Sequence, residues 1–332
     1  MSFQWSNSTD RLFRRCQRQF FFREIAGHHK AGEDWRREAY VLKQLKSLEA
    51  WRGSVIHEGI EHYLVPALKL GRPIDWGEIS EMTIRRAQAQ FAFSAARRYR
   101  EAGLTKTGRD EFCALLAHET GAGVSPEQFA EICEGIKIAF TNMSAREKFW
   151  AALRGKGSLQ AEKQYWVEFD EVKIQVKIDL LFERSPGKPT IIDWKSYEIG
   201  GDGDARLQTL LYGWALWKKN PFGIKAPEDI QLLEFQVQDG ALIEHECSQA
   251  AFDELEDFIY RSIHRIFSLC RSKKLTEVRL EDFAFTENPN NCEYCAFQKL
   301  CVAKSSAAMA HEREPKVTAT RASAPSASLI ER

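Results

Sequence analysis

The sequence predicts a mixed α/β fold in which a sheet core is flanked by helices. Residues 172–182 alternate between apolar and polar side chains, which is typical of a strand with one buried face. Residues 204–218 and 248–270 instead repeat apolar side chains at helical spacing. Strands and helices therefore intermix along the chain, and this order favours a mixed sheet covered by helices.

The composition is that of one large globular domain. The chain has 332 residues, 44% of them hydrophobic and 28% charged, which supplies enough apolar material for a large core. We expect a single domain over residues 1–303. After Cys301 the chain is rich in Ala, Ser and Pro and poor in bulky apolar side chains, so we expect residues 304–332 to form a disordered tail.

The first half of the chain is predicted to be helical. Ser and Asn residues precede an apolar stripe and can cap a helix over residues 6–25. A second helix is expected over residues 50–70, where apolar side chains recur at helical spacing. Residues from about 75 to 153 continue in a mostly helical pattern without recognisable chemistry, and we interpret them as a helical insertion.

The α/β core is expected over about residues 155–247. Strands are predicted over 161–169, 172–182 and 190–195, with a turn at Ser185-Pro186-Gly187 before the third strand. A helix over 204–218 follows, and two more strands meet around the hairpin dipeptide Asp239-Gly240. A long helix over 248–270 then completes the core.

Charge and hydropathy limit the location and partners of the chain. The formal net charge is zero, so whole-chain electrostatics give no argument for nucleic acid. Between Arg11 and Lys46, however, ten Lys and Arg stand against four Asp and Glu, which indicates either a solvated helical face or a phosphate-binding surface. Since the sequence has neither a signal peptide nor an apolar run of about 18 residues, we expect a cytoplasmic protein with no membrane segment.

Two acids and a lysine on neighbouring strands suggest hydrolytic chemistry. Asp193 and Lys195 are two residues apart on one strand, so their side chains share a face. Asp179 lies on the preceding strand, and a turn brings the two carboxylates within reach of each other. Hard oxygen ligands suit Mg²⁺, which activates water and neutralises phosphate charge, while a lysine stabilises the anionic transition state. The alternative for so short a motif is an ordinary ion pair on an exposed sheet face.

These residues carry a resemblance to a known family. Gln175 to Asp179, followed by IIDWKS, resembles the core of the PD-(D/E)XK nuclease superfamily. The stretches WRGSVIHEGIEHYL and RLQTLLYGWAL resemble the N-terminal helix and the Q-x-x-x-Y helix of its RecB-like branch. The resemblance implies a restriction-endonuclease-like fold and a deoxyribonuclease that uses Mg²⁺ or Mn²⁺. It assigns the metal to His57, Asp179, Asp193 and the Trp194 carbonyl, catalysis to Lys195 with both aspartates, and substrate binding to Gln208 and Tyr212. Glu162 is a further acidic candidate.

The late cysteines form a second candidate metal site. Cys292, Cys295 and Cys301 have the spacing C-x2-C-x5-C, and close-spaced thiolates of this kind usually bind metal. Three thiolates need a fourth ligand, and four would suit zinc or an iron–sulfur cluster. The segment around Cys16 resembles the N-terminal element of RecB-like nucleases, which include the AddB nuclease domain, CRISPR-associated RecB-like nucleases and exonuclease V. The resemblance implies a 4Fe–4S cluster on Cys16, Cys292, Cys295 and Cys301 that joins the N- and C-terminal segments.

The resemblance implies an exonuclease acting on single-stranded DNA or DNA ends, in repair, recombination or CRISPR or phage DNA processing. A helicase or another DNA-processing protein is an expected partner. The alternative is a non-catalytic DNA-binding or assembly module of a larger helicase–nuclease complex. The presence of His57, Asp179, Asp193 and Lys195 argues against that alternative.

Overall fold

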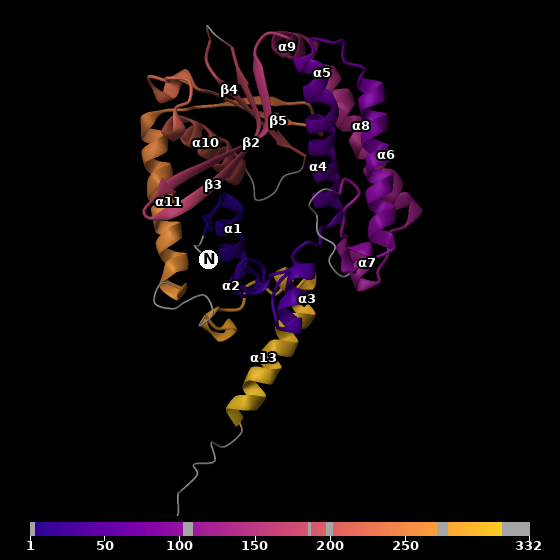
Figure 1. Ribbon diagram of the computed structural model, residues 1–332, viewed down its shortest axis with the longest axis vertical. Coiled ribbons are helices and arrows are strands. Elements are labelled where there is room, and N and C mark those ends of the chain that lie inside the picture. Colours follow the sequence, from indigo (N-terminus) through magenta and orange to yellow (C-terminus); the bar gives the residue numbers. More distant parts are fainter. Residues whose placement is uncertain (1–3, 102–108, 185–186, 197–201, 271–277, 314–332) are drawn as a thin grey trace, which may run out of the picture.

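A six-stranded mixed sheet lies between two layers of helices (Figure 1). The computed structural model describes residues 4–101, 109–184, 187–196, 202–270 and 278–313. The predicted mixed α/β class with flanking helices is therefore confirmed. Two residues of the predicted turn, Ser185 and Pro186, lie outside the described residues. Within those ranges, no helix combines the length and apolar character needed to cross a membrane.

The sheet is built around one long antiparallel hairpin. Its strands are β1 (Gln4–Trp5), β2 (Ser158–Phe169), β3 (Val172–Glu183), β4 (Thr190–Lys195), β5 (Gln231–Gln236) and β6 (Leu242–His245). The strand order is β1-β3-β4-β5-β6, and β2 pairs with β3. β4 and β5 run parallel, as do β1 and β3, and the other pairs are antiparallel. The sequence predicted every strand except β1, whose two residues are too few to carry a periodic pattern.

The N-terminal helix ends earlier than the pattern suggests. The elements here are α1 (Asn7–Arg15), α2 (Gln17–Phe20), the π-helical η1 (Phe21–Ala26) and α3 (Asp34–Leu42). Ser6 caps α1 by accepting a hydrogen bond from the Thr9 backbone at 3.2 Å. Cys16 has an extended backbone (φ −164°), and its Sγ accepts a hydrogen bond from the Gln19 backbone at 3.4 Å. The expected single helix over residues 6–25 is thus divided at this cysteine.

Helices of the insertion and its neighbours cover one face of the sheet. They are α4 (Leu48–Gly59), the π-helical η2 (Ile60–Leu64), α5 (Val65–Lys69), α6 (Trp76–Ala95), η3 (Arg98–Arg100), α7 (Leu116–Thr120), α8 (Pro126–Ser144) and α9 (Glu147–Leu153). Trp150 of α9 packs against Trp194 of β4 at a ring-centroid separation of 5.9 Å. The insertion therefore shares a hydrophobic core with the sheet.

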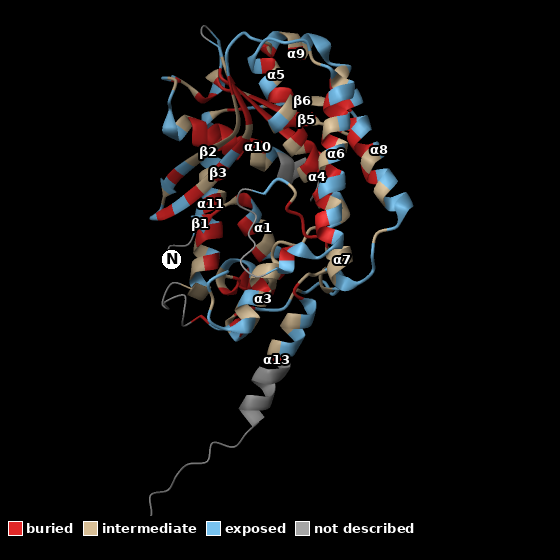
Figure 2. Cartoon of the chain, turned by 45° about the vertical axis from the view of Figure 1, so that its right-hand side comes forward, coloured by how far each residue is buried: buried red, intermediate tan, exposed pale blue. Residues whose placement is uncertain are grey.

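The opposite face is covered by the C-terminal helices and the N-terminal segment. These helices are α10 (Asp202–Lys219), η4 (Pro227–Asp229), α11 (Gln249–Cys270), η5 (Leu280–Asp282), α12 (Asn290–Glu293) and α13 (Gln298–Arg313). Buried aromatic residues Phe20, Phe21 and Phe22 join the core on this side. Figure 2 shows the buried residues concentrated on the sheet and on the helix faces turned toward it.

Helix α13 corrects part of the predicted disordered tail. Residues 304–313 are helical, and Ser305 is one reason for this, since its hydroxyl accepts a hydrogen bond from Arg18 at 2.5 Å. The same hydroxyl donates to the Cys301 carbonyl at 2.7 Å. Composition gave no sign of these contacts with the N-terminal segment. Residues 314–332 lie outside the described residues.

The side chains of strand β3 pack in one hydrophobic cluster before Asp179 and in both clusters after it. Ile174, Val176 and Ile178 pack in the cluster that contains α10 and α11, whereas Leu180 and Phe182 pack in the cluster that contains the insertion. The expectation of one buried face along residues 172–182 therefore holds only as far as Ile178. In the same hairpin, Glu162 of β2 has a left-handed backbone conformation (φ +54°).

Candidate functional site

The two aspartates lie side by side on adjacent strands. Leu180 of β3 pairs with Ile192 of β4 in antiparallel register, so Asp179 and Asp193 follow as the next opposing residues. The two carboxyl groups are close enough that each shifts the pKa of the other. The Trp194 backbone N–H donates to Asp179 Oδ2 at 3.0 Å. The antiparallel pairing thus brings together the two acids that the sequence identified.

Burial makes this pair difficult to ionise. Burial, and after it the neighbouring Asp179 charge, raise the pKa of Asp193 to about 7. Burial likewise raises the pKa of Asp179. A divalent cation beside two such carboxylates would favour their charged forms.

His57 and Glu162 join Asp179 as possible metal ligands. Their nearest ligand atoms all lie within 4.8 Å of one another, and His57 Nδ1 is 3.7 Å from Asp179 Oδ2. Burial lowers the pKa of His57 to about 4, so the imidazole is neutral near pH 7, as metal binding requires. The sequence gave Glu162 only as an additional candidate. In the structure it is close enough to His57 and Asp179 for the three side chains to hold one metal ion.

Lys195 contacts Asp193 directly. Its Nζ lies 2.6 Å from Asp193 Oδ2, and its side chain is only 15% exposed. Asp193 is fully buried and is absent from the 4.8 Å group. In the described structure, the carboxylate of Asp193 is therefore occupied by the lysine and by residues of α10.

Gln208 and Tyr212 of α10 lie beside the buried aspartate. Gln208 Nε2 donates to the Tyr212 hydroxyl at 2.6 Å and to Asp193 Oδ1 at 3.4 Å. Thr209 also donates to Asp193, from its hydroxyl to Oδ2 at 3.3 Å. The sequence missed Thr209 because a lone threonine in an amphipathic helix carries no chemical signal. These contacts orient Asp193, and Tyr212 also lines the open pocket.

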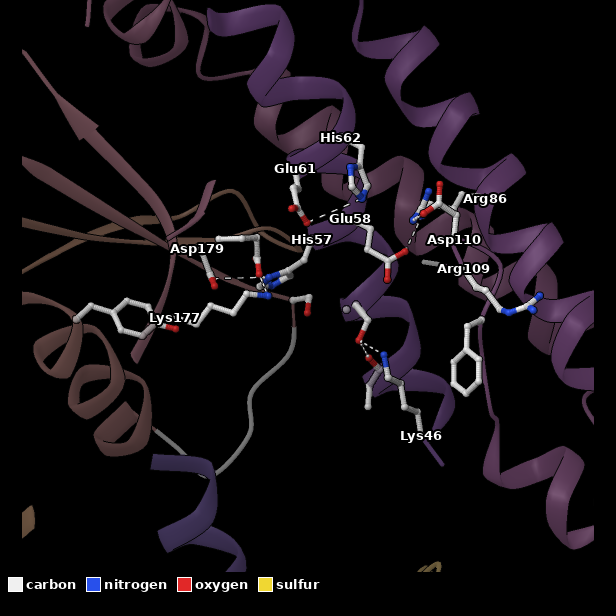
Figure 3. A pocket seen from close by; sticks show the side chains of 17 residues that line it. Lys46, His57, Glu58, Glu61, His62, Arg86, Arg109, Asp110, Lys177 and Asp179 are labelled. Atoms are coloured by element: carbon white, nitrogen blue, oxygen red, sulfur yellow. Dashed lines mark hydrogen bonds and ion pairs between the residues drawn. The ribbon is translucent and has the colours of Figure 1, made fainter. Parts of the chain in front are cut away.

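A pocket of about 630 Å³ joins this site to the helical insertion (Figure 3). Asp179, Lys177, Glu162, Ser196 and Tyr212 line it on the sheet side. On the other side it is lined by residues of α4 and η2 and by Lys46, Arg86, Arg109, Asp110 and Phe112. Lys177, which the sequence analysis missed, forms an ion pair with Glu162. The insertion, where the sequence offered no chemistry, thus contributes side chains to the same pocket.

The four predicted cluster ligands come from segments that touch each other. Asn291 Nδ2 donates to the Arg15 carbonyl at 3.3 Å, and Arg18 Nε donates to the Phe283 carbonyl at 3.1 Å. Burial, with smaller contributions from the nearby Cys16, Cys301 and Cys292, raises the pKa of Cys295 to about 11. Among the described residues, however, no three of these sulfur atoms lie within 4.8 Å of one another. Cys16 is therefore near the late cysteines, but the sulfurs do not form a compact group.

Comparison with known proteins gives one family and one solved structure. The sequence pattern of the family described as the PD-(D/E)XK nuclease superfamily matches residues 4–302. No curated protein matches the chain. A structure described as "Crystal structure of SSO0001" is similar with a TM-score of 0.28 and 14% identity, covering 76% of this chain and 94% of its own.

Proposed function

Because this chain belongs to the PD-(D/E)XK nuclease superfamily, we propose that it is a divalent-metal-dependent deoxyribonuclease whose active site is the pocket around Asp179. The observation that carries this proposal is the meeting of His57, Glu162 and Asp179 next to the Asp193–Lys195 pair. Family membership alone supports a nuclease. The distances in the pocket add to this by supporting particular residues of this chain as the proposed active site.

The donor set fits Mg²⁺ or Mn²⁺. Carboxylate oxygens suit these cations, and a neutral imidazole is a common additional ligand. His57, Glu162 and Asp179 are within reach of one ion, and Asp193 lies on the strand paired with that of Asp179. When bound, the ion lowers the pKa of a water molecule and neutralises charge that develops on the phosphate. We include Asp193 and the Trp194 carbonyl in the proposed ligand set.

The remaining residues orient these groups and the substrate. Lys195, held 2.6 Å from Asp193, supplies a positive charge that can orient the attacking water and stabilise the anionic transition state. Gln208 fixes Asp193 through its amide, which supports a positioning role in addition to the proposed contact with substrate. Tyr212 lines the pocket, which supports the proposed contact with substrate.

We further propose that the enzyme acts as an exonuclease on single-stranded DNA or DNA ends. Roles in repair, recombination or CRISPR or phage DNA processing, a cytoplasmic location and a helicase partner belong to the same proposal. They rest on the resemblance to RecB-like nucleases.

We also propose a 4Fe–4S cluster on Cys16, Cys292, Cys295 and Cys301. The contacts of Arg15 and Arg18 with residues 283–305 support the meeting of the two chain ends. A zinc ion with Zn–S bonds of about 2.3 Å needs sulfurs about 3.8 Å apart in a tetrahedron. Among the described residues, no three of these sulfurs meet that spacing, so iron and zinc content must be measured to distinguish the two metals.

The test is cleavage of end-labelled single- and double-stranded DNA by protein purified without oxygen. We expect loss of the labelled terminal nucleotide from single strands with Mg²⁺ or Mn²⁺, and no cleavage in EDTA. Iron and sulfide content measured on the same sample tests the cluster independently. A cluster-containing protein that binds DNA but leaves every substrate intact would support the non-catalytic alternative instead.

A further inference from the structure

Arg18 is a buried cation beside the proposed cluster ligands. It follows Cys16 by two residues in α2, and only 9% of the residue is exposed. Its Nε donates to the Phe283 carbonyl at 3.1 Å, and its Nη1 donates to the Ser305 hydroxyl at 2.5 Å. The guanidinium also lies over the Phe285 ring, 3.6 Å from the ring centroid. These contacts with the C-terminal segments fix the position of the charged group.

The contacts of Arg18 with Phe283, Ser305 and Phe285 are with neutral groups. Among the residues that the structure describes, no carboxylate oxygen lies within 4.0 Å of its guanidinium nitrogens. Arg86, whose side chain is similarly shielded with 12% exposed, is by contrast paired with Glu58 at 2.6 Å. Burial of a charge is strongly unfavourable unless an opposite charge compensates it. We therefore expect an anion other than a carboxylate beside Arg18.

The position of Arg18 points to Cys301. Ser305 lies one helical turn after Cys301 in α13, and its hydroxyl donates to the Cys301 carbonyl at 2.7 Å. Through its hydrogen bond to Ser305, Arg18 is thus held against the turn of α13 that carries this cysteine. Burial raises the pKa of the Cys301 thiol, whereas the nearby Arg18 charge acts in the opposite direction by favouring the thiolate.

Metal binding would make the cysteine group anionic. Cys16, Cys292 and Cys301 lie near enough to Cys295 to contribute to its raised pKa, so the four sulfurs share one region. Free thiols are neutral near pH 7, but cysteines bind metals as thiolates. Four thiolates outweigh the charge of a Zn²⁺ ion, and a 4Fe–4S cluster with four thiolates is likewise anionic. Either centre would supply the negative charge that Arg18 lacks.

We infer that Arg18 is the counter-cation of a metal–thiolate centre formed by Cys16, Cys292, Cys295 and Cys301. The inference rests on the proposed cluster and adds a charge-compensating residue to it. A fixed positive charge beside the sulfurs stabilises the thiolates and so slows the loss of metal. In an iron–sulfur cluster it also raises the reduction potential, because it favours the form that carries one more electron.

A purely structural role for Arg18 makes a different prediction. In that case the arginine only joins the N-terminal segment to Phe283 and Ser305. Lysine would then replace it as poorly as glutamine, because neither side chain reproduces the fork of the guanidinium. A counter-cation is instead replaced in part by lysine, whose ammonium group keeps the charge.

The experiment compares metal retention and reduction potential across matched variants. Wild-type, Arg18→Gln and Arg18→Lys proteins are purified without oxygen, and their iron, sulfide and zinc contents are measured. Metal release to a colorimetric chelator is followed with time, and iron-loaded proteins are titrated with dithionite in the presence of redox dyes. Ser305→Ala removes one neutral partner of Arg18 without a change of charge. Arg23→Gln removes an arginine whose side chain is 48% exposed and lies beside Glu24.

We expect Arg18→Gln to release metal about tenfold faster than the wild type, as for other residues that support metal ligands. Its midpoint potential should fall by about 59 mV, which corresponds to a tenfold change in a one-electron equilibrium. Arg18→Lys should lie closer to the wild type than to Arg18→Gln in both measurements. Ser305→Ala and Arg23→Gln should keep the wild-type potential. If the metal is zinc, the release rates alone decide.

Equal metal release in the wild type and Arg18→Gln would contradict the inference. Equal losses in Arg18→Gln and Arg18→Lys would also contradict it, because they indicate a structural role alone. If Arg18→Gln does not fold, Arg18→Lys decides: retained metal supports the inference and lost metal contradicts it.

The same samples separate this inference from the proposals on which it depends. Wild-type protein that contains neither iron nor zinc would refute the proposed cluster together with the role of Arg18. Cluster-containing protein without Arg18 dependence would refute that role alone. DNA cleavage is assayed separately, so metal-loaded protein with the expected Arg18 dependence that leaves DNA intact would refute only the nuclease proposal.

Discussion

The carboxylate pocket and the four cysteines are assembled in different ways. The acids and Lys195 lie on neighbouring strands, and the antiparallel register of β3 and β4 fixes their separation. Cys16 and Cys301, by contrast, come from opposite ends of the described chain, in segments joined by polar contacts and by buried aromatic packing such as Phe22 on Phe297 at 5.6 Å. We propose that strand pairing preorganises the two aspartates and Lys195, whereas the cysteine sulfurs reach their final positions only when a cluster binds. Substitution of Lys195 should therefore reduce DNA cleavage with little effect on stability, whereas substitution of Cys16 should mainly reduce stability.

The largest expected effect is at Lys195. Lys195→Ala removes the ammonium group next to Asp193 and should slow DNA cleavage by at least about 10²-fold, the cost of losing one electrostatic contact in a transition state. Circular dichroism and iron content should stay at wild-type values. Lys188→Ala, at an exposed position before β4, is the control and should cleave normally. Wild-type cleavage by Lys195→Ala would remove this residue from the mechanism.

Cys16→Ser should mainly affect stability. If Cys16 ligates the cluster, its loss releases iron, and the binding free energy that holds the chain ends together is lost from folding. We expect the thermal midpoint to fall by roughly 5 °C or more, measured by differential scanning fluorimetry without oxygen. Cys133→Ser, in α8, should retain iron and stability. Full iron content in Cys16→Ser would show that another residue completes the site.

Glu162→Gln tests which acids bind the divalent ion. Glu162 belongs to the group of possible ligand atoms within 4.8 Å of one another, so its loss should weaken Mn²⁺ binding by about tenfold or more. Isothermal titration of the variant and of Glu168→Gln, an exposed acid on the same strand, provides the measurement and its control. Equal Mn²⁺ affinity in both variants would leave Asp179 and Asp193 as the main acidic ligands.

Gly59→Ala tests how closely the insertion supports helix α4. A β-carbon at Gly59 would lie 2.3 Å from Thr83 Oγ1 and 3.0 Å from Phe140 Cζ, so α4, α6 and α8 must separate. We expect a loss of about 1–3 kcal/mol in unfolding free energy. Gly77→Ala in α6, where the nearest atom is 3.4 Å away, is the matched control for urea denaturation. A more stable Gly59→Ala protein would mean that these helices adjust without cost.

The smallest expected effect concerns an ion-pair cluster in the insertion. Burial raises the pKa of Glu119, but hydrogen bonds from Arg100 and Tyr99 outweigh burial and lower it overall. Because the pKa is lower in the folded state, this carboxylate stabilises the fold above its unfolded pKa, near 4.5, and the contribution is lost as pH falls through the folded value. Glu119→Gln should therefore cost about 1 kcal/mol at pH 7 and progressively less below pH 4.5. Thermal melts across this range measure the difference, and a constant difference would contradict the assignment.

The sequence predicted the parts of the molecule that local patterns determine. Strand alternation identified β2 and β3, the turn after β3 introduced the predicted third strand, and the i, i+2 spacing of Asp193 and Lys195 placed both on one face. Resemblance to a family added His57, Gln208 and Tyr212, which have no distinctive local pattern. All of these side chains lie in or beside the pocket.

The remaining features depend on tertiary contacts. The crossing of β3 between two cores at Asp179 depends on which helices pack on each side, and the apolar run Leu180-Leu181-Phe182 does not by itself say which core each side chain joins. Arg109 and Lys177 resemble any exposed cation in the sequence, and only folding places them in the pocket. Residues 304–313 are helical although their composition suggested disorder, and Arg18 contacts Ser305 from the other end of the chain.

The most direct test of the account is to locate Mn²⁺ by anomalous scattering in crystals of the protein. We predict one strong site in the pocket, coordinated by His57 and Asp179 together with Glu162, Asp193 or both. Asp179→Asn crystals should lose that site. A Mn²⁺ ion bound elsewhere, or bound in this pocket without Asp179, would contradict the account.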